Sequence, residues 1–144
     1  MKLEKEFNHY LANLGIFTMK LHNIHWNVEG ERFVAVHEFT DDEYNKFFER
    51  MDEIAELLKM YEVMPKSTMK EYLEIASIVE EPTRKFECRE GLKIVLDDIE
   101  SIRKNATELR NLSDEARMFS AVSLLEDHIS DYNKVIWFLK ATLA

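Results

Sequence analysis

Five residues between positions 25 and 56 are of the types that bind transition metals. His25 and His37 flank a glycine, and Asp41, Asp52 and Glu56 follow His37 at intervals of four, eleven and four residues. Imidazole and carboxylate groups together form a recognised ligand set for non-haem iron and for zinc. These residues are therefore a candidate metal site.

The carboxylates share one face of a helix that is predicted to begin near Phe33. At about 100° per residue, Asp41, Asp52 and Glu56 all lie within about 100° of His37. A separate apolar stripe of the kind that packs into a helical bundle contains Tyr44, Phe47, Met51, Ile54 and Leu58. The metal-binding residue types thus lie beside the core-facing stripe, on a face of their own.

One chain cannot bring both ends of this face to one ion. His37 and Asp52 are fifteen residues apart, which is about 22 Å of helix, whereas a ligand atom lies about 2 Å from its metal. His25 and His37 are nearly equidistant from the turn, so they can meet on antiparallel helices. Asp52 and Glu56 would then come from a second subunit, across a two-fold axis near residues 44 and 45, giving two identical sites per dimer.

The composition favours a single helical domain spanning residues 1–144. A chain of 144 residues that is 46% hydrophobic can bury one core but is too short for two ordinary domains. It has only three Gly and two Pro, which leaves few turns and favours a small number of long helices. With a net charge of −9 and no run of Lys or Arg, nucleic-acid binding by the folded body is not expected.

The cellular location is predicted from segments that the sequence lacks. It has no apolar signal core and no run of about 18 apolar residues that could form a membrane span. The single cysteine, Cys88, cannot form an internal disulfide, which fits a reducing compartment. We therefore expect a soluble cytoplasmic protein.

Apolar residues at intervals of three and four predict four long helices. Their approximate ranges are 3–29, 33–62, 88–111 and 113 to the C-terminus. Gly30 is expected to end the first helix as its C′ residue, and Ser113 to cap the N-terminus of the last.

The connection between the second and third helices is long, from about residue 62 to residue 87. Thr68 and Glu71 form a capping box that starts a short helix within this connection. Pro82 closes off the connection. A connection of this length can cross from one end of a bundle to the other, which makes the second and third helices parallel. The prediction is an all-α, ferritin-like four-helix bundle with a short helix in the crossover.

Several residues also have simpler interpretations. Taken alone, His25 at the edge of a buried stripe could be a hydrogen-bonded core residue, and His9 and His22 are interpreted as partly exposed or structural. Glu6 and His9 form the only Glu-x-x-His pair. The buried di-iron centre of four-helix bundles needs that pair on two helices, so it is poorly supported here. Cys88 has no nearby partner that would suggest a nucleophile.

The sequence closely resembles the Dps family of miniferritins. The resemblance lies in the segments LHNIHWNVEG, VHEFTDDEY and MDEIAE, and the closing KVIWFLKATL is similar to that family's end. It covers nearly the whole chain and is weakest from 82 to 115. The positions that match the family's ferroxidase ligands are His25, His37, Asp41, Asp52 and Glu56. Trp26 matches the aromatic residue beside that site, where it could relay an electron or simply pack at the dimer seam.

The resemblance implies a hollow dodecamer with sites shared across two-fold interfaces. It also implies oxidation of Fe(II), with hydrogen peroxide as preferred oxidant, storage of ferric mineral inside the shell and protection against oxidative damage. Histidines and carboxylates in a weak, open site suit an iron that binds as Fe(II) and leaves as Fe(III). The alternative is a non-catalytic four-helix scaffold or binding protein, whose His and Asp residues form hydrogen bonds at a subunit interface.

Two features depart from the family pattern. Some members bind DNA through lysine-rich tails, and this sequence has neither an N-terminal nor a C-terminal extension, so DNA compaction is not expected. Many members place an Asp fourteen residues before the last Trp, where it lines a three-fold iron pore, but this position is Ser123. Glu126, Asp127 and Asp131 are alternatives, and the sequence does not choose among them.

Overall fold

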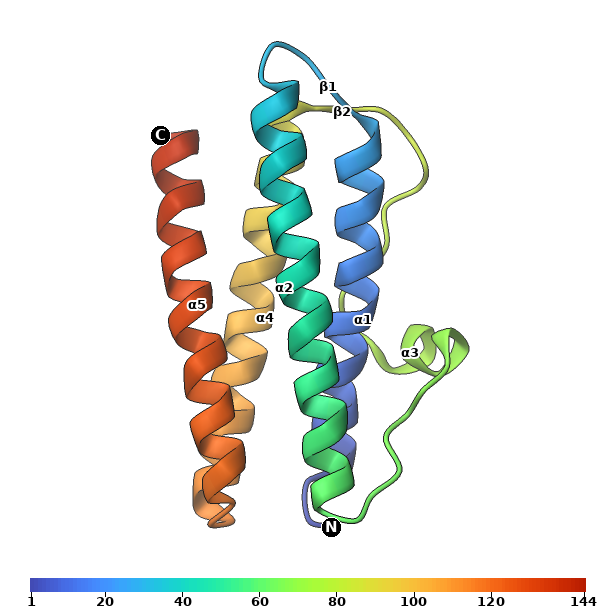
Figure 1. Cartoon of the computed structure of the whole chain (residues 1–144), viewed down its shortest axis with the longest axis vertical. Coiled ribbons are helices and arrows are strands. Elements are labelled where there is room, and N and C mark those ends of the chain that lie inside the picture. Colours follow the sequence, from blue (N-terminus) through green and yellow to red (C-terminus); the bar gives the residue numbers. More distant parts are fainter.

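The computed structural model describes all 144 residues, and four long helices lie side by side in it (Figure 1). These helices are α1 (Glu4–Asn27), α2 (Phe33–Met60), α4 (Cys88–Glu115) and α5 (Phe119–Leu143). The short helix α3 (Met69–Ile75) lies beside α1, outside the bundle, within the crossover. Because that crossover runs from one end of the bundle to the other, α2 and α4 are parallel, which confirms the predicted ferritin-like topology.

One apolar core fills the space between the long helices, and it consists of 34 buried hydrophobic residues. In α2 the predicted stripe faces this core, since Phe47, Ile54 and Leu58 are fully or almost fully buried. Phe47 meets Phe17 of α1 edge-on, with 4.7 Å between ring centroids. Burial of each large apolar side chain contributes about 1.5–3 kcal/mol, so this packing fixes the position of α2 against α1. None of the helices combines the length and apolar character needed to span a membrane.

The crossover is fastened to the bundle by Asn13 of α1. Its side-chain oxygen accepts the backbone N–H groups of Ser77 at 2.8 Å and Ile78 at 3.1 Å. Its amide nitrogen donates to the side-chain oxygen of Asn105 in α4, at 2.9 Å. The predicted capping residue Thr68 accepts the backbone N–H of Glu71 at the start of α3. These bonds explain why so long a connection is ordered.

The turn between α1 and α2 differs from the prediction in one respect. The first helix ends at Asn27, so Gly30 is not its C′ residue. Instead, Val28–Glu29 form a short strand, β1, which pairs in parallel with β2 (Phe86–Glu87). Gly30 follows with φ of 131°, and a Cβ there would lie 3.2 Å from the sulfur of Cys88. A glycine is therefore needed at this position to let the turn pass close to the start of α4.

The prediction that Ser113 caps the last helix is wrong. Ser113 is buried inside α4, where its hydroxyl donates to the carbonyl oxygen of Leu109 at 2.7 Å. The hydroxyl is thus satisfied within the helix, which continues to Glu115. The actual turn occupies residues 116–118, with Arg117 in the left-handed region at φ of 58°. The last helix, α5, therefore begins at Phe119 with Met118 at its N-cap position, five residues after the predicted cap.

Candidate metal centre

The histidine half of the predicted site is formed by α1 and α2 on either side of their connecting turn. The imidazole rings of His25 and His37 are stacked, with 3.7 Å between centroids and 14° between planes. The Nδ1–H of His25 donates to the carbonyl oxygen of His37 at 2.7 Å, and that of His37 donates to the carbonyl oxygen of His25 at 2.9 Å. Each ring is therefore held in place by the backbone of the other residue.

These reciprocal bonds determine which nitrogen is free. A carbonyl oxygen can only accept, so both Nδ1 atoms carry hydrogen, and in a neutral ring the lone pair is then on Nε2. Burial lowers the pKa of His25 and the neighbouring His37 lowers it further, although the bond to the carbonyl opposes this shift. A metal-binding histidine characteristically donates its second nitrogen to a carbonyl or carboxylate. The Nε2 atoms of the pair are thus candidate metal ligands.

Asp41 lies beside this pair, one helical turn after His37. Its negative charge acts on the His25 ring. Asn45 donates to one of its carboxylate oxygens at 3.0 Å, and a hydrogen bond with Asp41 raises the pKa of the Tyr44 phenol. These contacts hold the Asp41 carboxylate against neighbouring side chains of its own helix.

Asp52 and Glu56 lie farther along α2 and are exposed to solvent. Neither side chain forms a hydrogen bond or an ion pair with the rest of the chain, in contrast to Asp41. No group of three or more His, Cys, Asp or Glu side chains within one chain is arranged to hold a metal ion. The structure therefore brings His25 and His37 together, but it does not gather Asp41, Asp52 or Glu56 into a metal-binding cluster with them.

Aromatic residues surround the histidine pair. Phe33 stacks on His37 with 5.0 Å between centroids, and Trp26 lies 5.3 Å from the ring of His22. Trp26 of α1 is 59% exposed. Phe48, which lies on the same face of α2 as His37, is 63% exposed. His22 is half-buried and donates to a backbone carbonyl of its own helix, which agrees with its predicted structural role. Phe33 thus packs on the histidine pair, while Trp26 on α1 and Phe48 on α2 are exposed aromatic side chains.

The alternatives to the missing pore aspartate all lie on the exposed side of α5, as does Ser123. Glu126 pairs with Arg110 at 3.1 Å, and Asp131 pairs with Arg50 at 3.6 Å. Asp127 forms no ion pair. Of the three, Asp127 is therefore the carboxylate that no cation of its own chain neutralises.

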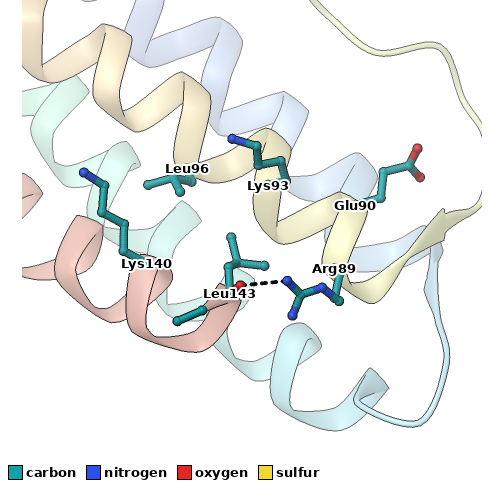
Figure 2. Close-up of a pocket in the computed structure, with 7 residues that line it drawn as sticks. Arg89, Glu90, Lys93, Leu96, Lys140 and Leu143 are labelled. Carbon is teal, nitrogen blue, oxygen red and sulfur yellow. Dashed lines mark hydrogen bonds between the residues drawn. The ribbon is translucent and has the colours of Figure 1, made fainter.

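Two surface pockets lie outside the predicted site. One, of about 480 Å³, lies between the start of α4 and the end of α5 (Figure 2). Its polar lining is mainly basic, from Arg89, Lys93 and Lys140, and Arg89 donates to the carbonyl oxygen of Leu143 at 2.7 Å. It contains none of the predicted ligands. The other, of about 500 Å³, is a polar groove between α2 and α5.

A buried polar cluster beneath that groove was not anticipated from the sequence. The Tyr10 hydroxyl lies 2.9 Å from Nδ1 of His128 and 2.7 Å from the hydroxyl of Tyr132. His128 is 2% exposed, and burial, followed by the charge of Arg50, lowers its pKa to about 4. The only sequence signal was the presence of two tyrosines at core-facing positions, whose hydroxyls need partners when buried.

Comparisons with known proteins agree with this fold. The model of the ferritin-like domain family matches residues 4–144, which places the protein in the ferritin-like class. Over 96% of this chain and 90% of the relative, the sequence is 38% identical to the DNA protection during starvation protein (Dps) of Listeria innocua. The protein of that name from Helicobacter pylori is 31% identical over the full length of both chains. The chain belongs to the Dps family.

Solved structures of Dps proteins match closely. A zinc-soaked Dps from Listeria innocua has a TM-score of 0.94 at 34% identity, covering 99% of this chain and 96% of that one. A Vibrio cholerae Dps, described as a member of a broad superfamily of ferritin-like diiron-carboxylate proteins, has a TM-score of 0.95 at 26% identity, covering 99% and 89%. The resemblance identified from the sequence is thereby confirmed.

Proposed function

We propose that this protein is a ferroxidase and iron-storage protein. It oxidises Fe(II), with hydrogen peroxide as oxidant, and stores ferric mineral inside a shell of twelve chains, which protects the cell against oxidative damage. The observation that carries this proposal is the reciprocal hydrogen bonding of His25 and His37, which leaves both Nε2 atoms free as ligands. Membership of the Dps family, which includes a protein described as diiron-carboxylate, supports iron as the metal.

Each site takes its ligands from two chains. One chain supplies His25, His37 and the adjacent Asp41, and its partner supplies Asp52 and Glu56 across a two-fold axis. Two observations support this division: the two carboxylates have no partner in their own chain, and Trp26 on α1 and Phe48 on α2 are exposed aromatic side chains. Exposed aromatic side chains of this kind are expected to be covered by another chain.

The chemistry requires both kinds of ligand. Two Fe(II) ions supply the two electrons that convert one peroxide and two protons into two waters. The neutral imidazoles bind Fe(II) without adding charge, and the carboxylates stabilise the extra positive charge of Fe(III). A weak, open site of this kind would let the Fe(III) product leave for the mineral. Trp26 follows the proposed ligand His25 in α1 and is 59% exposed, so it can donate an electron or pack against the partner chain.

Protection by this route does not require DNA binding. The chain carries a net charge of −9, and twelve copies multiply that charge, so the phosphate backbone is repelled. We infer that DNA is protected by removal of Fe(II) and peroxide. Two Fe(II) ions together give two electrons to each peroxide. This avoids the one-electron reduction of peroxide that forms hydroxyl radical.

Anaerobic titration with Fe(II), followed by a pulse of peroxide, tests the proposal. The rate of Fe(III) formation should exceed that in buffer and saturate with iron, and His25→Ala with His37→Ala should abolish the excess rate. The mass of the assembly, measured for both proteins, controls for loss of the shell. Oxidation no faster than in buffer by an intact assembly would favour the scaffold alternative.

A further inference from the structure

The buried cluster of Tyr10, His128 and Tyr132 joins two helices and contacts a third. Tyr10 belongs to α1, the other two residues to α5, and Glu53 of α2 completes the chain of contacts, with its carboxylate 3.1 Å from Nε2 of His128. Both tyrosines are completely buried. The cluster therefore meets solvent only at the groove between α2 and α5, which is lined by Glu53 and by the edge of His128.

The hydrogen bonds of this cluster have only one consistent direction. The Glu53 carboxylate can only accept, so Nε2 of His128 carries hydrogen and Nδ1 of the neutral ring is an acceptor. Tyr10 must then donate its O–H to Nδ1 of His128, and its oxygen accepts the O–H of Tyr132. Tyr10 is thus a buried phenol whose proton already points at an unprotonated base.

Loss of the proton alone is unfavourable for such a phenol. Burial raises the pKa of Tyr10 well above its ordinary value, because a phenolate would be an unsolvated charge. Removal of an electron together with the proton has no such penalty, because the product is a neutral radical. An oxidised phenol is also a much stronger acid than a phenol, so even His128, with its lowered pKa, can take the proton.

Charges around the cluster distinguish the two tyrosines. The guanidinium group of Arg50 lies 4.8 Å from the ring centroid of Tyr132, where its positive charge opposes loss of an electron. Tyr10 has no cation over its ring. The Glu53 carboxylate, on the far side of His128, stabilises the imidazolium that forms when His128 accepts the proton. The electrostatics therefore favour Tyr10 as the electron donor.

We propose that Tyr10 is a redox-active residue that supplies the second electron when peroxide meets a site holding a single Fe(II). This role rests on the proposed ferroxidase function. One Fe(II), one tyrosine, one peroxide and two protons from solvent yield Fe(III), a tyrosyl radical and two waters, and the phenolic proton moves to Nδ1 of His128. A later Fe(II) returns the electron, and His128 returns the proton, so the tyrosine is restored.

The position of the cluster suits this role. Glu53 directly follows Asp52 in α2, so the hydrogen-bonded chain begins one residue from the carboxylate half of the proposed site. Without such a donor, a peroxide that has taken one electron would leave the site as a hydroxyl radical or its equivalent. Tyr10 would instead complete the reduction to water.

Freeze-quench EPR after a peroxide pulse tests the proposal on the assembled protein. With less than one Fe(II) per site, we expect the signal of a tyrosyl radical, narrowed when ring-deuterated tyrosine is incorporated, and weaker when iron is in excess. Tyr10→Phe and His128→Gln should lose it. Tyr132→Phe should keep it with an altered line shape, because the radical oxygen loses a hydrogen bond.

Tyr72→Phe is the matched control. Tyr72 is also buried, but its hydroxyl donates to the carbonyl oxygen of Lys66 at 2.7 Å and so has no base to take its proton. This variant should retain the full signal. Should Tyr10→Phe fail to assemble, His128→Gln decides, because it retains both tyrosines and removes only the base.

The outcomes separate this role from the ferroxidase function. Fe(III) formation by the wild-type protein without a tyrosyl signal would overturn the role of Tyr10 and leave the ferroxidase intact. A signal that survives in Tyr10→Phe, or is lost in Tyr132→Phe alone, would also overturn it. Absence of any protein-dependent Fe(III) formation would overturn both proposals together.

Discussion

Co-assembly of two inactive variants provides a direct test of sites shared between chains. His25→Ala removes a histidine ligand, and Asp52→Ala removes a carboxylate ligand. Since His25 stacks on His37, and His37 lies fifteen residues or about 22 Å from Asp52 along α2, the two changes damage different halves of a shared site. Each variant alone should be inactive.

The expected recovery follows from the two-fold geometry. In a mixed dimer, one site contains both lesions, and the other contains neither, because its histidines and its carboxylates come from the undamaged halves of different chains. Random pairing makes half of the dimers mixed. About a quarter of wild-type activity should therefore return.

The matched control places both substitutions in one chain and co-assembles it with wild-type protein. Shared sites then leave only wild-type pairs active, again about a quarter, whereas sites confined to one chain would leave about half. Activity is measured as the initial rate of Fe(III) formation after a peroxide pulse, and mass spectrometry verifies the mixture. No recovery in the first mixture, together with half activity in the control, would refute the intersubunit arrangement.

Three further predictions concern the site, the surface and the buried cluster. Asp52→Asn with Glu56→Gln should leave the oligomer intact and slow Fe(II) oxidation by at least about tenfold; unchanged kinetics would remove both residues from the site. The protein should not shift plasmid DNA in a gel at neutral pH and moderate salt; a stable complex would reveal a basic surface or a metal bridge. Because the pKa of His128 is lowered from 6.5 to about 4, the unfolded chain binds a proton that the folded chain does not. The contribution of neutral His128 to the free energy of unfolding is therefore complete above about pH 6.5. It falls by about 3 kcal/mol as the pH drops to 4. Thermal melts of His128→Gln should depend less on acid than those of the wild type, and equal dependence would contradict the assignment.

The long helices could be predicted because their apolar residues recur with the helical period over many turns. The predicted and observed starts of α2 and α4 coincide at Phe33 and Cys88. The end of α4 was misplaced because Ser113 followed by acidic residues has the composition of a helix start, although its hydroxyl bonds within the helix. The turn that does end α4 uses a left-handed Arg117, which has no glycine to mark it.

The site was predictable to the extent that it depends on helix geometry. Equal distances from one turn placed His25 opposite His37, and spacing along α2 separated Asp52 from both. Their bonds to each other's carbonyl groups could not be predicted, because they depend on the exact separation of two backbones. The cluster around Tyr10 and His128 joins residues 118 positions apart, which no local pattern connects. Strands β1 and β2 are two residues each, too short to show alternation.

The mutual bonds of His25 and His37 also restrict how the turn between them can vary. Each ring depends on a carbonyl group on the opposite side of residues 28–32, so one inserted residue would displace both rings at once. The crossover between α2 and α4, by contrast, is fastened at separate points by α1 side chains such as Asn13, Lys20 and Asn23, and its exposed stretches can change length without moving a proposed ligand. Evolutionary insertions and engineered tags should therefore be tolerated in the crossover and excluded from the short turn.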